Sequence, residues 1–484
     1  MTSKKVHIKC FGCQMNKLDS SLVASALREA GFELVEKAVE ADAVVINTCS
    51  VRQHAEDRVF SHLGHLKHMK KTRPELVVAV MGCMAQRLGE ALLAHEAVDM
   101  VVGPHQIAQI PGMLVNAVEA RGCAVKAQGF GAKGGDCAAK GGDFAPQIAI
   151  TGDIRRPDDA DAAEALDLFE VEHDSDANHI KSQAFVRVMR GCDNFCTYCV
   201  VPYVRGPEMS RPPWAIVEQV RKLAEKGIQQ VTLLGQCVSS YRSCAGERTY
   251  LLADLLEMAA NVEGIRWVRF VTSHPAKFDD SILEAMARLP KVCPYLHIPA
   301  QSGSDRILAA MNRRYTAGQY LDLLARARAT VPDIAIAGDF IVGFPGETEE
   351  DFEATKALVR AACYKNIFVF KYSPRPGTRA EQKLADSVPL EVKQRRNQEL
   401  LALQDEIAAE ANRRFAGRVV EVLVEGPSKK AHVNKADEAG HPQLVGRTAT
   451  DYIVVFNGPE SLTGQFAQVR IEQTSALTLF GKLA

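Results

Sequence analysis

The sequence predicts an α/β protein with three folded domains: an N-terminal parallel α/β sheet domain, a central partial (β/α) barrel and a C-terminal small all-β barrel. Over residues 1–120, near-continuous apolar runs alternate with helical segments, which is typical of a parallel sheet covered on both faces. Repeated β/α units over residues 181–412 favour a partial barrel. Short strands separated by Gly and Pro turns over residues 413–484 indicate a small barrel made only of strands.

The composition is that of an ordinary globular protein. Apolar residues make up 47% of the 484 residues and charged residues 24%. The formal net charge of −1 neither requires nor excludes a nucleic-acid partner. We find no apolar run long enough for a transmembrane helix and no secretory signal, and therefore expect a cytoplasmic protein without a membrane partner. In a reducing compartment, the 13 cysteines are expected to serve metal binding or catalysis and not disulfides.

In the N-terminal domain, three apolar runs predict buried strands, and helical spacing predicts a helix over residues 16–30 and another over residues 50–71. The strand runs are VHIKCFGC, ADAVVINTC and ELVVAVMGC. Residues 121–180 are rich in Gly and Asp without periodicity, which predicts a linker or a mobile insertion.

The later domains are predicted in the same way. In the central domain the strand candidates are FVRVM, QQVTLLG, IRWVRFVTS, YLHIPA, IAIAGDFIVGF and NIFVFKYS. The helix candidates there are residues 214–226, 251–260, 280–289, 318–330, 348–362 and a charged stretch at 389–414. The final domain has the strand candidates GRVVEVLVEG, PQLVGRT, YIVVF, FAQVRIEQ and ALTLFG.

Three cysteines each follow a separate N-terminal strand: Cys13, Cys49 and Cys83. Ligand sites of parallel sheets lie beyond the carboxyl ends of the strands, so we expect the three thiols at one edge. The alternative is that all three are core cysteines. Each lies in a polar or Gly-containing turn (FGCQMN, NTCSVR, MGCMAQR), and this favours a metal site. Cys10, inside the first strand, is interpreted as structural, although it could be a fourth ligand.

A second set, Cys192, Cys196 and Cys199, occupies the stretch RGCDNFCTYC after the first strand of the central domain. Thiolates suit zinc or iron–sulfur clusters. Structural zinc requires four ligands, and the next cysteines, Cys237 and Cys244, fall beyond the following β/α unit. Three ligands on a four-iron cluster leave one iron open, which predicts that a substrate or cofactor binds there.

With its C-x3-C-x2-C motif after a first barrel strand, the chain resembles the radical S-adenosylmethionine (SAM) superfamily. It resembles more closely the MiaB-like tRNA methylthiotransferases, over nearly its whole length except residues 121–180. The matching motifs are FGCQMNKLDS, VINTCSVRQHAEDRVFSHLG, MGCMAQR, RGCDNFCTYCVVPYVRGPEMSR, HIPAQSGS, MNRRYT, GDFIVGFPGET and YSPRPGT. From about Arg413 the chain resembles a TRAM domain, a small RNA-binding barrel.

The resemblance implies a tRNA-2-methylthio-N6-dimethylallyladenosine synthase activity. Such enzymes insert a methylthio group at C2 of N6-isopentenyladenosine beside the anticodon, using one SAM as methyl donor and a second as the source of a 5′-deoxyadenosyl radical. It further implies two 4Fe–4S clusters. Cys192, Cys196 and Cys199 would hold the radical-generating cluster, and Cys13, Cys49 and Cys83 an auxiliary cluster that carries the sulfur.

The resemblance also suggests residues that contact SAM. Tyr198 is expected near its adenine, and Gln301, Arg313 or Arg314, and Asp339 are further candidates. An arginine pairs well with a carboxylate. A solvated helix end is an equally good interpretation of Arg313 and Arg314.

The implied partners are tRNA carrying N6-isopentenyladenosine, an electron donor such as a flavodoxin or ferredoxin, and a sulfur or cluster carrier, and we expect a monomer. Candidate phosphate contacts are Arg413, Lys429, Lys430 and Arg447, although each alone is more often a solvated charge. His62, His65 and His68 lie on one predicted helix and are expected to form a polar or tRNA-facing surface in preference to a metal site.

The chain departs from the family's motifs in places. Cys237 and Ser239 stand where we expect Asn, Gly338 stands where Thr is usual, and the 121–180 segment adds Cys123 and Cys137. Two other functions are alternatives. One is methylthiolation of threonylcarbamoyladenosine; GCQMN and NTCSVR favour the isopentenyladenosine enzymes instead. The other is a zinc-bearing RNA-binding protein without catalysis, and two three-cysteine sites are unusual for structural zinc.

Overall fold

The computed structural model describes residues 4–50, 53–129, 145–152, 160–173, 182–429 and 440–484. The chain groups into two compact units. Unit 1 comprises Met1–Ala177, Arg190–Asp193 and Val200–Met209, and unit 2 comprises Asn178–Met189, Asn194–Cys199 and Ser210–Ala484. The domain boundaries predicted from the sequence stay predictions. No helix of the described residues is both long enough and apolar enough to cross a membrane.

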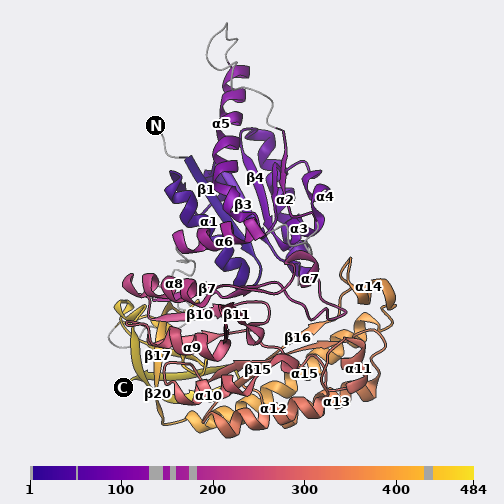
Figure 1. The fold of residues 1–484 in the computed structure, drawn as a ribbon, viewed down its shortest axis with the longest axis vertical. Coiled ribbons are helices and arrows are strands. Elements are labelled where there is room, and N and C mark those ends of the chain that lie inside the picture. Colours follow the sequence, from indigo (N-terminus) through magenta and orange to yellow (C-terminus); the bar gives the residue numbers. More distant parts are fainter. Residues whose placement is uncertain (1–3, 51–52, 130–144, 153–159, 174–181, 430–439) are drawn as a thin grey trace. The chain divides into compact units, whose positions relative to one another are not determined.

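The sheet of unit 1 has the strand order β2-β1-β3-β4-β5-β6, and all neighbouring strands are parallel (Figure 1). The strands are β1 Lys4–Phe11, β2 Phe32–Leu34, β3 Ala43–Thr48, β4 Val77–Gly82, β5 Met100–Val102 and β6 Gln147–Ala149. Every residue of β3 and β4 is buried, which explains their continuous apolar sequences. The parallel α/β sheet predicted for the N-terminal domain is therefore confirmed.

The helices of unit 1 are α1 Gln14–Glu29, α2 Gln53–Thr72, α3 Cys83–Leu88, α4 Glu90–Leu93, α5 Ile110–Gly129, α6 Ala160–Glu172 and α7 Val201–Val204. Helix α2 packs on the sheet through Val59, Leu63 and Leu66, which join Val44 and Val78 in one buried cluster. The predicted helix over residues 50–71 corresponds to α2, and residues 51–52 lie outside the described part.

Residues 121–180, which the sequence predicts to be a linker or mobile insertion, contain regular secondary structure in their described part. Helix α5 continues to Gly129, β6 adds a strand beside β5, and α6 spans Ala160–Glu172. Strand β6 has only three residues and its Ile148 is exposed, so the stretch is too short to predict a strand from the sequence alone. Cys137 and residues 130–144, 153–159 and 174–181 lie outside the described residues.

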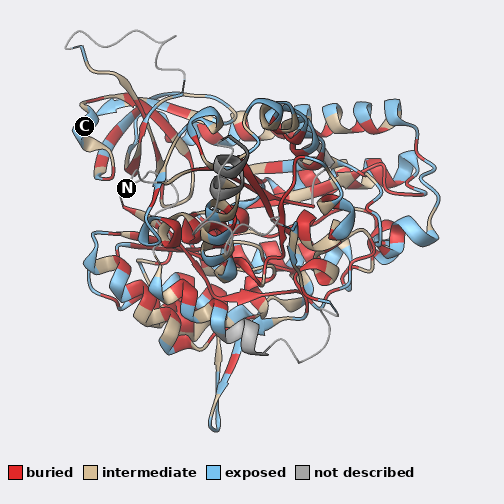
Figure 2. Cartoon of the chain, turned by 90° about the horizontal axis from the view of Figure 1, so that it is seen from above, coloured by how far each residue is buried: buried red, intermediate tan, exposed pale blue. Residues whose placement is uncertain are grey.

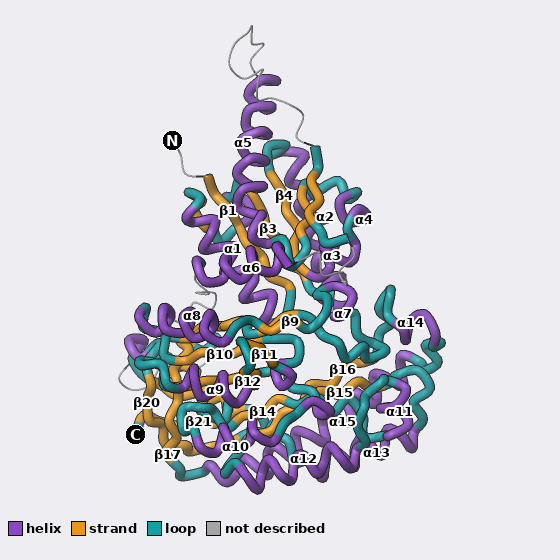
Figure 3. Tube along the Cα trace, viewed as in Figure 1, coloured by secondary structure: helices purple, strands orange, loops and turns teal. Residues whose placement is uncertain are grey.

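Unit 2 contains two parallel three-stranded sheets, β13-β10-β7 and β14-β15-β16. Their strands are β7 Gln183–Arg187, β10 Gln230–Leu234, β13 Trp267–Phe270, β14 Tyr295–His297, β15 Ala335–Val342 and β16 Asn366–Lys371. A parallel bridge between Val268 and Val292 leads from β13 toward β14. Figure 3 shows these strands in orange with helices along them. This is the partial (β/α) barrel that the sequence predicted.

The helices of the barrel are α8 Pro213–Glu225, α9 Leu252–Ala260, α10 Asp280–Arg288, α11 Asp305–Ala310, α12 Ala317–Thr330, α13 Glu349–Ala362, α14 Arg379–Lys383 and α15 Leu390–Asn412. Several begin with a side-chain cap. Thr316 and Gln319 form a capping box at α12, and Thr348 and Asp351 form one at α13. Figure 2 colours each residue by its burial and shows strands that are largely red and helices that alternate between red and pale blue.

The C-terminal part of unit 2 is a closed barrel with the strand order β17-β18-β19-β21-β20. The strands are β17 Val419–Pro427, β18 Gln443–Thr448, β19 Ile453–Asn457, β20 Phe466–Thr474 and β21 Thr478–Leu483, which confirms the five strands predicted. Its core is not separate from the central barrel, because Tyr295 and Ala335 pack in the same buried cluster as Val422, Val454 and Ile471.

Candidate functional site

The three N-terminal cysteines follow three strands that are neighbours in the sheet. Cys13 is the N-cap of α1 after β1, Cys49 follows β3 directly, and Cys83 is the first residue of α3 after β4. The sheet order places β1 beside β3 and β3 beside β4. Cys49 and Cys83 are buried, whereas Cys13 is exposed. The structure thus brings these three predicted residues to the carboxyl ends of adjacent strands.

Buried amides hold this edge together. The Asn16 side chain donates to the Asn47 Oδ1 atom at 2.8 Å, and the Asn47 side chain donates to the Asn16 carbonyl at 2.7 Å. Asn16 Oδ1 also accepts from the backbone N–H and the thiol of Cys13, both at 3.3 Å. Both amides are completely buried, so each is costly to leave unpaired. The network connects the Cys13 turn to the end of β3, two residues before Cys49.

Gly82 allows β4 to deliver Cys83 at this point. Its φ of +100° is in the region that favours glycine, and a Cβ there would lie 2.5 Å from the Thr48 carbonyl oxygen. The same Cβ would lie 2.6 Å from Asn47 Oδ1. Any larger residue before Cys83 would therefore push the ends of β3 and β4 apart.

The three thiols differ in electrostatic surroundings. A hydrogen bond with Cys49 lowers the pKa of the Cys13 thiol to about 6, with a further contribution from the charge of Arg205. Burial raises the pKa of the Cys83 thiol, although the guanidinium of Arg205 opposes this effect. Three neighbouring thiols beside a cation are a donor set that suits an iron–sulfur cluster. Within the described residues, no three Cys, His, Asp or Glu side chains already have a metal-binding arrangement.

Arg205 is a residue of this site that the sequence analysis missed. It lies 122 residues from Cys83 in the chain, yet its Nε donates to the Cys83 Sγ atom at 3.2 Å. Its Nη2 donates to Asp19 Oδ2 at 2.9 Å. The motif VVPYVRG contains this arginine, but its spacing does not connect it with the N-terminal strands.

The loop with the second cysteine set passes from unit 1 to unit 2. Within unit 1, the Cys192 N–H donates to the Gly206 carbonyl at 3.0 Å. Within unit 2, the Thr197 N–H donates to the Met311 carbonyl at 3.0 Å, and the Ala380 N–H donates to the Thr197 carbonyl at 2.7 Å. Cys196 is buried and Cys199 is half-buried.

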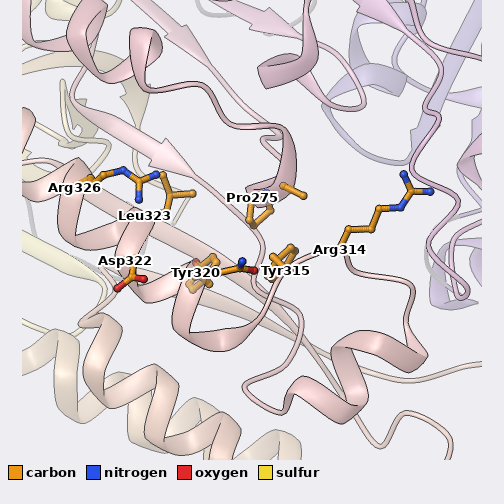
Figure 4. Close-up of a pocket in the computed structure, with 9 residues that line it drawn as sticks. Pro275, Arg314, Tyr315, Tyr320, Asp322, Leu323 and Arg326 are labelled. Carbon is orange, nitrogen blue, oxygen red and sulfur yellow. The ribbon is translucent and has the colours of Figure 1, made fainter.

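The two candidate arginines have different surroundings. Arg313 is buried, and its guanidinium donates to Cys196 Sγ at 3.4 Å, to the Pro299 carbonyl at 3.0 Å and to the Tyr315 hydroxyl at 2.9 Å. Arg314 lines a cavity of about 350 Å³. Figure 4 shows that Arg314 extends away from Tyr315 and Tyr320, which lie together. Of the two, Arg313 is the one that reaches a cysteine of the motif.

Gln301 and Asp339 lie together in unit 2. The Gln301 N–H donates to the Asp339 carbonyl at 2.7 Å, and the Gln301 carbonyl accepts from the Ile341 N–H at 3.0 Å. The Asp339 carboxylate also contacts His297 Nε2 at 3.2 Å, a partner that the sequence analysis did not single out. Asp339 and His297 are both only partly buried.

Tyr198 packs in a small apolar cluster with Ile307, Met311, Phe344 and Tyr372. Burial raises the pKa of its hydroxyl well above the usual range, although Arg313 opposes the shift. The hydroxyl therefore stays protonated at neutral pH, and the ring offers an apolar face beside Cys196 and Cys199.

The unusual residues of the barrel fit their surroundings. A Cβ at Gly338 would lie 3.0 Å from the Tyr364 ring, so the neighbouring tyrosine takes the space that a threonine would need. Ser239 accepts a hydrogen bond from the His274 N–H at 3.1 Å. Cys237 is buried, and its thiol lies 3.7 Å from the Ser239 hydroxyl.

The predicted RNA contacts are dispersed. Arg447 is paired with Glu425 and Asp451, and Arg413 with Glu410. Lys429 is exposed, whereas Lys430 lies outside the described residues. On α2, the His62 ring packs against Phe11. Burial lowers the pKa of His62, so this imidazole is neutral at physiological pH.

Comparison with known proteins agrees with this fold. Residues 186–359 match the radical SAM superfamily, residues 413–484 match the TRAM domain, and residues 5–103 match the uncharacterized protein family UPF0004. Fold and cysteine loop together define a radical SAM enzyme, a class that uses SAM and a 4Fe–4S cluster.

Curated relatives define the family further. A protein of Rhodopirellula baltica is 42% identical over 99% of this chain and 96% of its own length, and one of Bacteroides fragilis is 41% identical over the same shares. A relative from Halalkalibacterium halodurans is 38% identical over 99% of this chain and 81% of its own. All three are named tRNA-2-methylthio-N(6)-dimethylallyladenosine synthase. The chain belongs to the MiaB-like methylthiotransferase family.

Among solved structures, a radical SAM methyltransferase, TsrM from Kitasatospora setae, gives a TM-score of 0.49 at 13% identity, covering 78% of this chain and 77% of its own. This likeness is too distant to bear on function. Family membership does exclude the non-catalytic zinc protein considered above, because the chain is an enzyme.

Proposed function

We propose that the chain methylthiolates C2 of N6-isopentenyladenosine beside the anticodon of tRNA, using one SAM as methyl donor and another as radical source. The observation that carries the proposal is a second set of thiols, at the ends of β1, β3 and β4, in addition to the cysteine loop of the radical SAM region. A radical SAM enzyme that only generates a radical needs one such set. A second set is suited to supplying sulfur.

We further propose that Cys192, Cys196 and Cys199 hold one 4Fe–4S cluster, and that Cys13, Cys49 and Cys83 hold the other. When bound, these clusters supply the electron that cleaves SAM and the sulfur of the methylthio group. The aromatic C–H bond has no acidic proton, so acid–base groups alone could not replace this chemistry.

The protein's own residues would orient the reactants. Arg313 steadies the Cys196 side chain through its guanidinium, and its other nitrogens are held by Pro299 and Tyr315. We propose that Asp339 and Gln301, which are hydrogen-bonded to each other through their backbones, bind a ribose or amino-acid group of SAM. His297, 3.2 Å from the Asp339 carboxylate, would orient that carboxylate. Tyr198 supplies an apolar face for an adenine, and Arg314 is a second candidate for the SAM carboxylate.

The remaining partners are proposed from chemistry. The TRAM barrel and the named relatives support tRNA as the substrate. The enzyme needs an electron donor such as a flavodoxin or ferredoxin, and a sulfur or cluster carrier would replace the sulfur that is consumed. We propose that it acts as a monomer in the cytoplasm.

Nucleoside mass spectrometry tests the proposal. The protein, reconstituted anaerobically with iron and sulfide, receives SAM, a reductant and tRNA carrying N6-isopentenyladenosine. A methylthio mass gain on that nucleoside is expected. Deoxyadenosine without the gain would point to another substrate, and tRNA carrying threonylcarbamoyladenosine would be tried next. If the protein is shown to hold both clusters and forms neither product, the proposed reaction is contradicted.

A further inference from the structure

Arg205 lies in a segment that follows the second cysteine set but belongs to unit 1. Helix α7 ends at Val204, and the residues Val200–Met209 are part of the N-terminal unit. Only 3% of Arg205 is exposed. Val200 and Val204 of the same segment pack against Cys83. The chain therefore buries an arginine in an apolar setting beside one thiol of the N-terminal set.

The guanidinium of Arg205 lies between a thiol and a carboxylate. Its Nε contacts Cys83 Sγ at 3.2 Å and its Nη2 contacts Asp19 Oδ2 at 2.9 Å. The side chains of Arg205 and Asp19 are 4% and 1% exposed. Buried charges are strongly unfavourable unless they are paired, so both partners are needed to hold this cation. The pair presents its positive end to Cys83 and its negative end away from it.

The same segment is hydrogen-bonded to the second cysteine set. The carbonyl of Gly206, the next residue after Arg205, accepts from the Cys192 N–H at 3.0 Å. The Arg205 carbonyl lies 3.3 Å from the His105 imidazole. Side chain and backbone of this one stretch thus contact a cysteine of each set, and all of these contacts lie within unit 1.

We propose that Arg205 is a positioning residue. Its positive charge beside Cys83 raises the reduction potential of the cluster held by Cys13, Cys49 and Cys83. The proposal rests on the proposed function, which assigns that cluster. A fixed cation beside a thiolate ligand favours the more negative, reduced state of a cluster, since hydrogen bonds and charge near the sulfur set its potential. Asp19 limits this effect because its carboxylate partly neutralises the guanidinium.

The alternative is that Arg205 and Asp19 form a purely structural ion pair. The two interpretations differ in sign. A structural pair is broken equally by Arg205→Gln and by Asp19→Asn, so both variants would disturb the cluster in the same direction. In the electrostatic interpretation, Arg205→Gln removes the cation and lowers the potential. Asp19→Asn leaves the cation unbalanced and raises it.

The experiment uses the full chain with Cys192→Ala, Cys196→Ala and Cys199→Ala, so that only the N-terminal site can hold a cluster. Iron and sulfide are quantified, and the midpoint potential is measured by redox titration followed by electron paramagnetic resonance. The variants Arg205→Gln, Asp19→Asn and Arg205→Lys are made in this background. Arg121→Gln is the matched control, because it breaks another pair between an arginine and a buried aspartate, Asp99, in the same unit.

We expect Arg205→Gln and Asp19→Asn to shift the ratio of reduced to oxidised cluster in opposite directions, each about tenfold, which corresponds to about 59 mV for one electron. Arg205→Lys keeps the charge and should retain most of the potential, and the control should not change. Equal potentials in all variants, or shifts of one sign, would overturn the proposal.

Two further results remain interpretable. If Arg205→Gln does not fold, the test uses Asp19→Asn and the double variant that combines Arg205→Gln with Asp19→Asn. A raised potential in Asp19→Asn or a lowered potential in the double variant supports the proposal. Unchanged potentials in both overturn it. If the background chain itself holds no iron, the assignment of the cluster fails, and with it the proposed function. That outcome is distinct from a cluster that binds but does not respond to Arg205.

Discussion

Cys10 and Cys13 lie three residues apart, but their surroundings give the two thiols opposite properties. Burial in β1 raises the pKa of Cys10 to about 11, whereas hydrogen bonding with Cys49 lowers the pKa of Cys13 to about 6. A thiol that ionises readily is a ready metal ligand. The pKa alone does not identify the ligands, however, because burial also raises the pKa of the proposed ligand Cys83. At the residue scale, the three candidate ligands share a position just beyond a strand end, whereas Cys10 is half-buried and lies within β1.

This difference predicts the outcome of two substitutions. Cys49→Ala should abolish methylthio transfer while reductive cleavage of SAM continues, because only the N-terminal thiol set is changed. Cys10→Ala is the control, and it should leave both reactions within about twofold. The readouts are methylthio nucleoside and 5′-deoxyadenosine by mass spectrometry. Multiple-turnover transfer by Cys49→Ala would show that the cluster assignment is wrong.

His274 predicts an acid-sensitive contribution to stability. Burial lowers the pKa of its imidazole from 6.5 to about 2, helped by the charges of Arg313, Lys277 and Arg314. The folded pKa lies below the unfolded one, so the unfolded chain binds the extra proton as the pH falls below 6.5. The contribution of His274 to the free energy of unfolding is therefore present above pH 6.5 and is lost on acidification. The loss amounts to about 2 kcal/mol at pH 5.

The measurement compares urea unfolding of the apoprotein at pH 7 and pH 5. His274→Asn cannot be protonated, and its side-chain oxygen can still accept from the Ala276 N–H, as the imidazole does. It should therefore lose less free energy of unfolding between the two pH values than the parent chain. Identical losses would mean that His274 is protonated in the folded protein.

At the scale of elements, segments with a clear apolar pattern were predictable, and pairings between distant parts of the chain were not. Helices α12 and α13 have capped starts and apolar faces, and the predicted bounds differ from those observed by a residue at most. Strand β6 has only three residues, so its pairing with β5 and not its own sequence identifies it as a strand. Pairings such as that of Arg205 with Asp19 depend on the folded chain, since 186 residues separate them.

The turn before Cys192 is an element whose sequence is dictated by space. Gly191 has a φ of +71°, and a Cβ there would lie 1.8 Å from the Pro207 carbonyl oxygen. Gly191→Ala should displace the loop and prevent it from binding a cluster. Reconstituted protein would then contain roughly half the iron of the parent, and 5′-deoxyadenosine formation would be lost.

Gly377→Ala is the matched control for this prediction. Gly377 has a similar φ of +87°, but nothing lies within 4 Å of a Cβ added there. The control therefore introduces backbone strain of about 1 kcal/mol without a clash, and both clusters should remain. If the two variants lost iron equally, backbone strain and not the contact with Pro207 would be responsible.

At the scale of the whole molecule, the C-terminal barrel is part of the core of unit 2. Tyr295 of β14 packs with Phe415 and Val422, and the Trp267 ring meets the Phe466 ring edge-on at 4.7 Å. Arg269 of β13 donates to the carbonyls of Thr448 and Ala449 at 2.6 and 3.0 Å. An RNA-binding module added to an independent barrel would not need these contacts.

Removing residues 413–484 should therefore abolish RNA binding by this domain and also destabilise the central barrel. Exposing the Tyr295 and Trp267 surfaces alone is expected to cost about 3 kcal/mol or more of unfolding free energy. The measurement is urea unfolding of the shortened apoprotein and of the full-length apoprotein, with tryptophan fluorescence as the signal. The control is Lys429→Ala in the full chain, an exposed position at which stability should not change. An unchanged midpoint in the shortened chain would mean that the barrel is an independent appendage, because Trp267 would then have lost its Phe466 contact without a loss of stability.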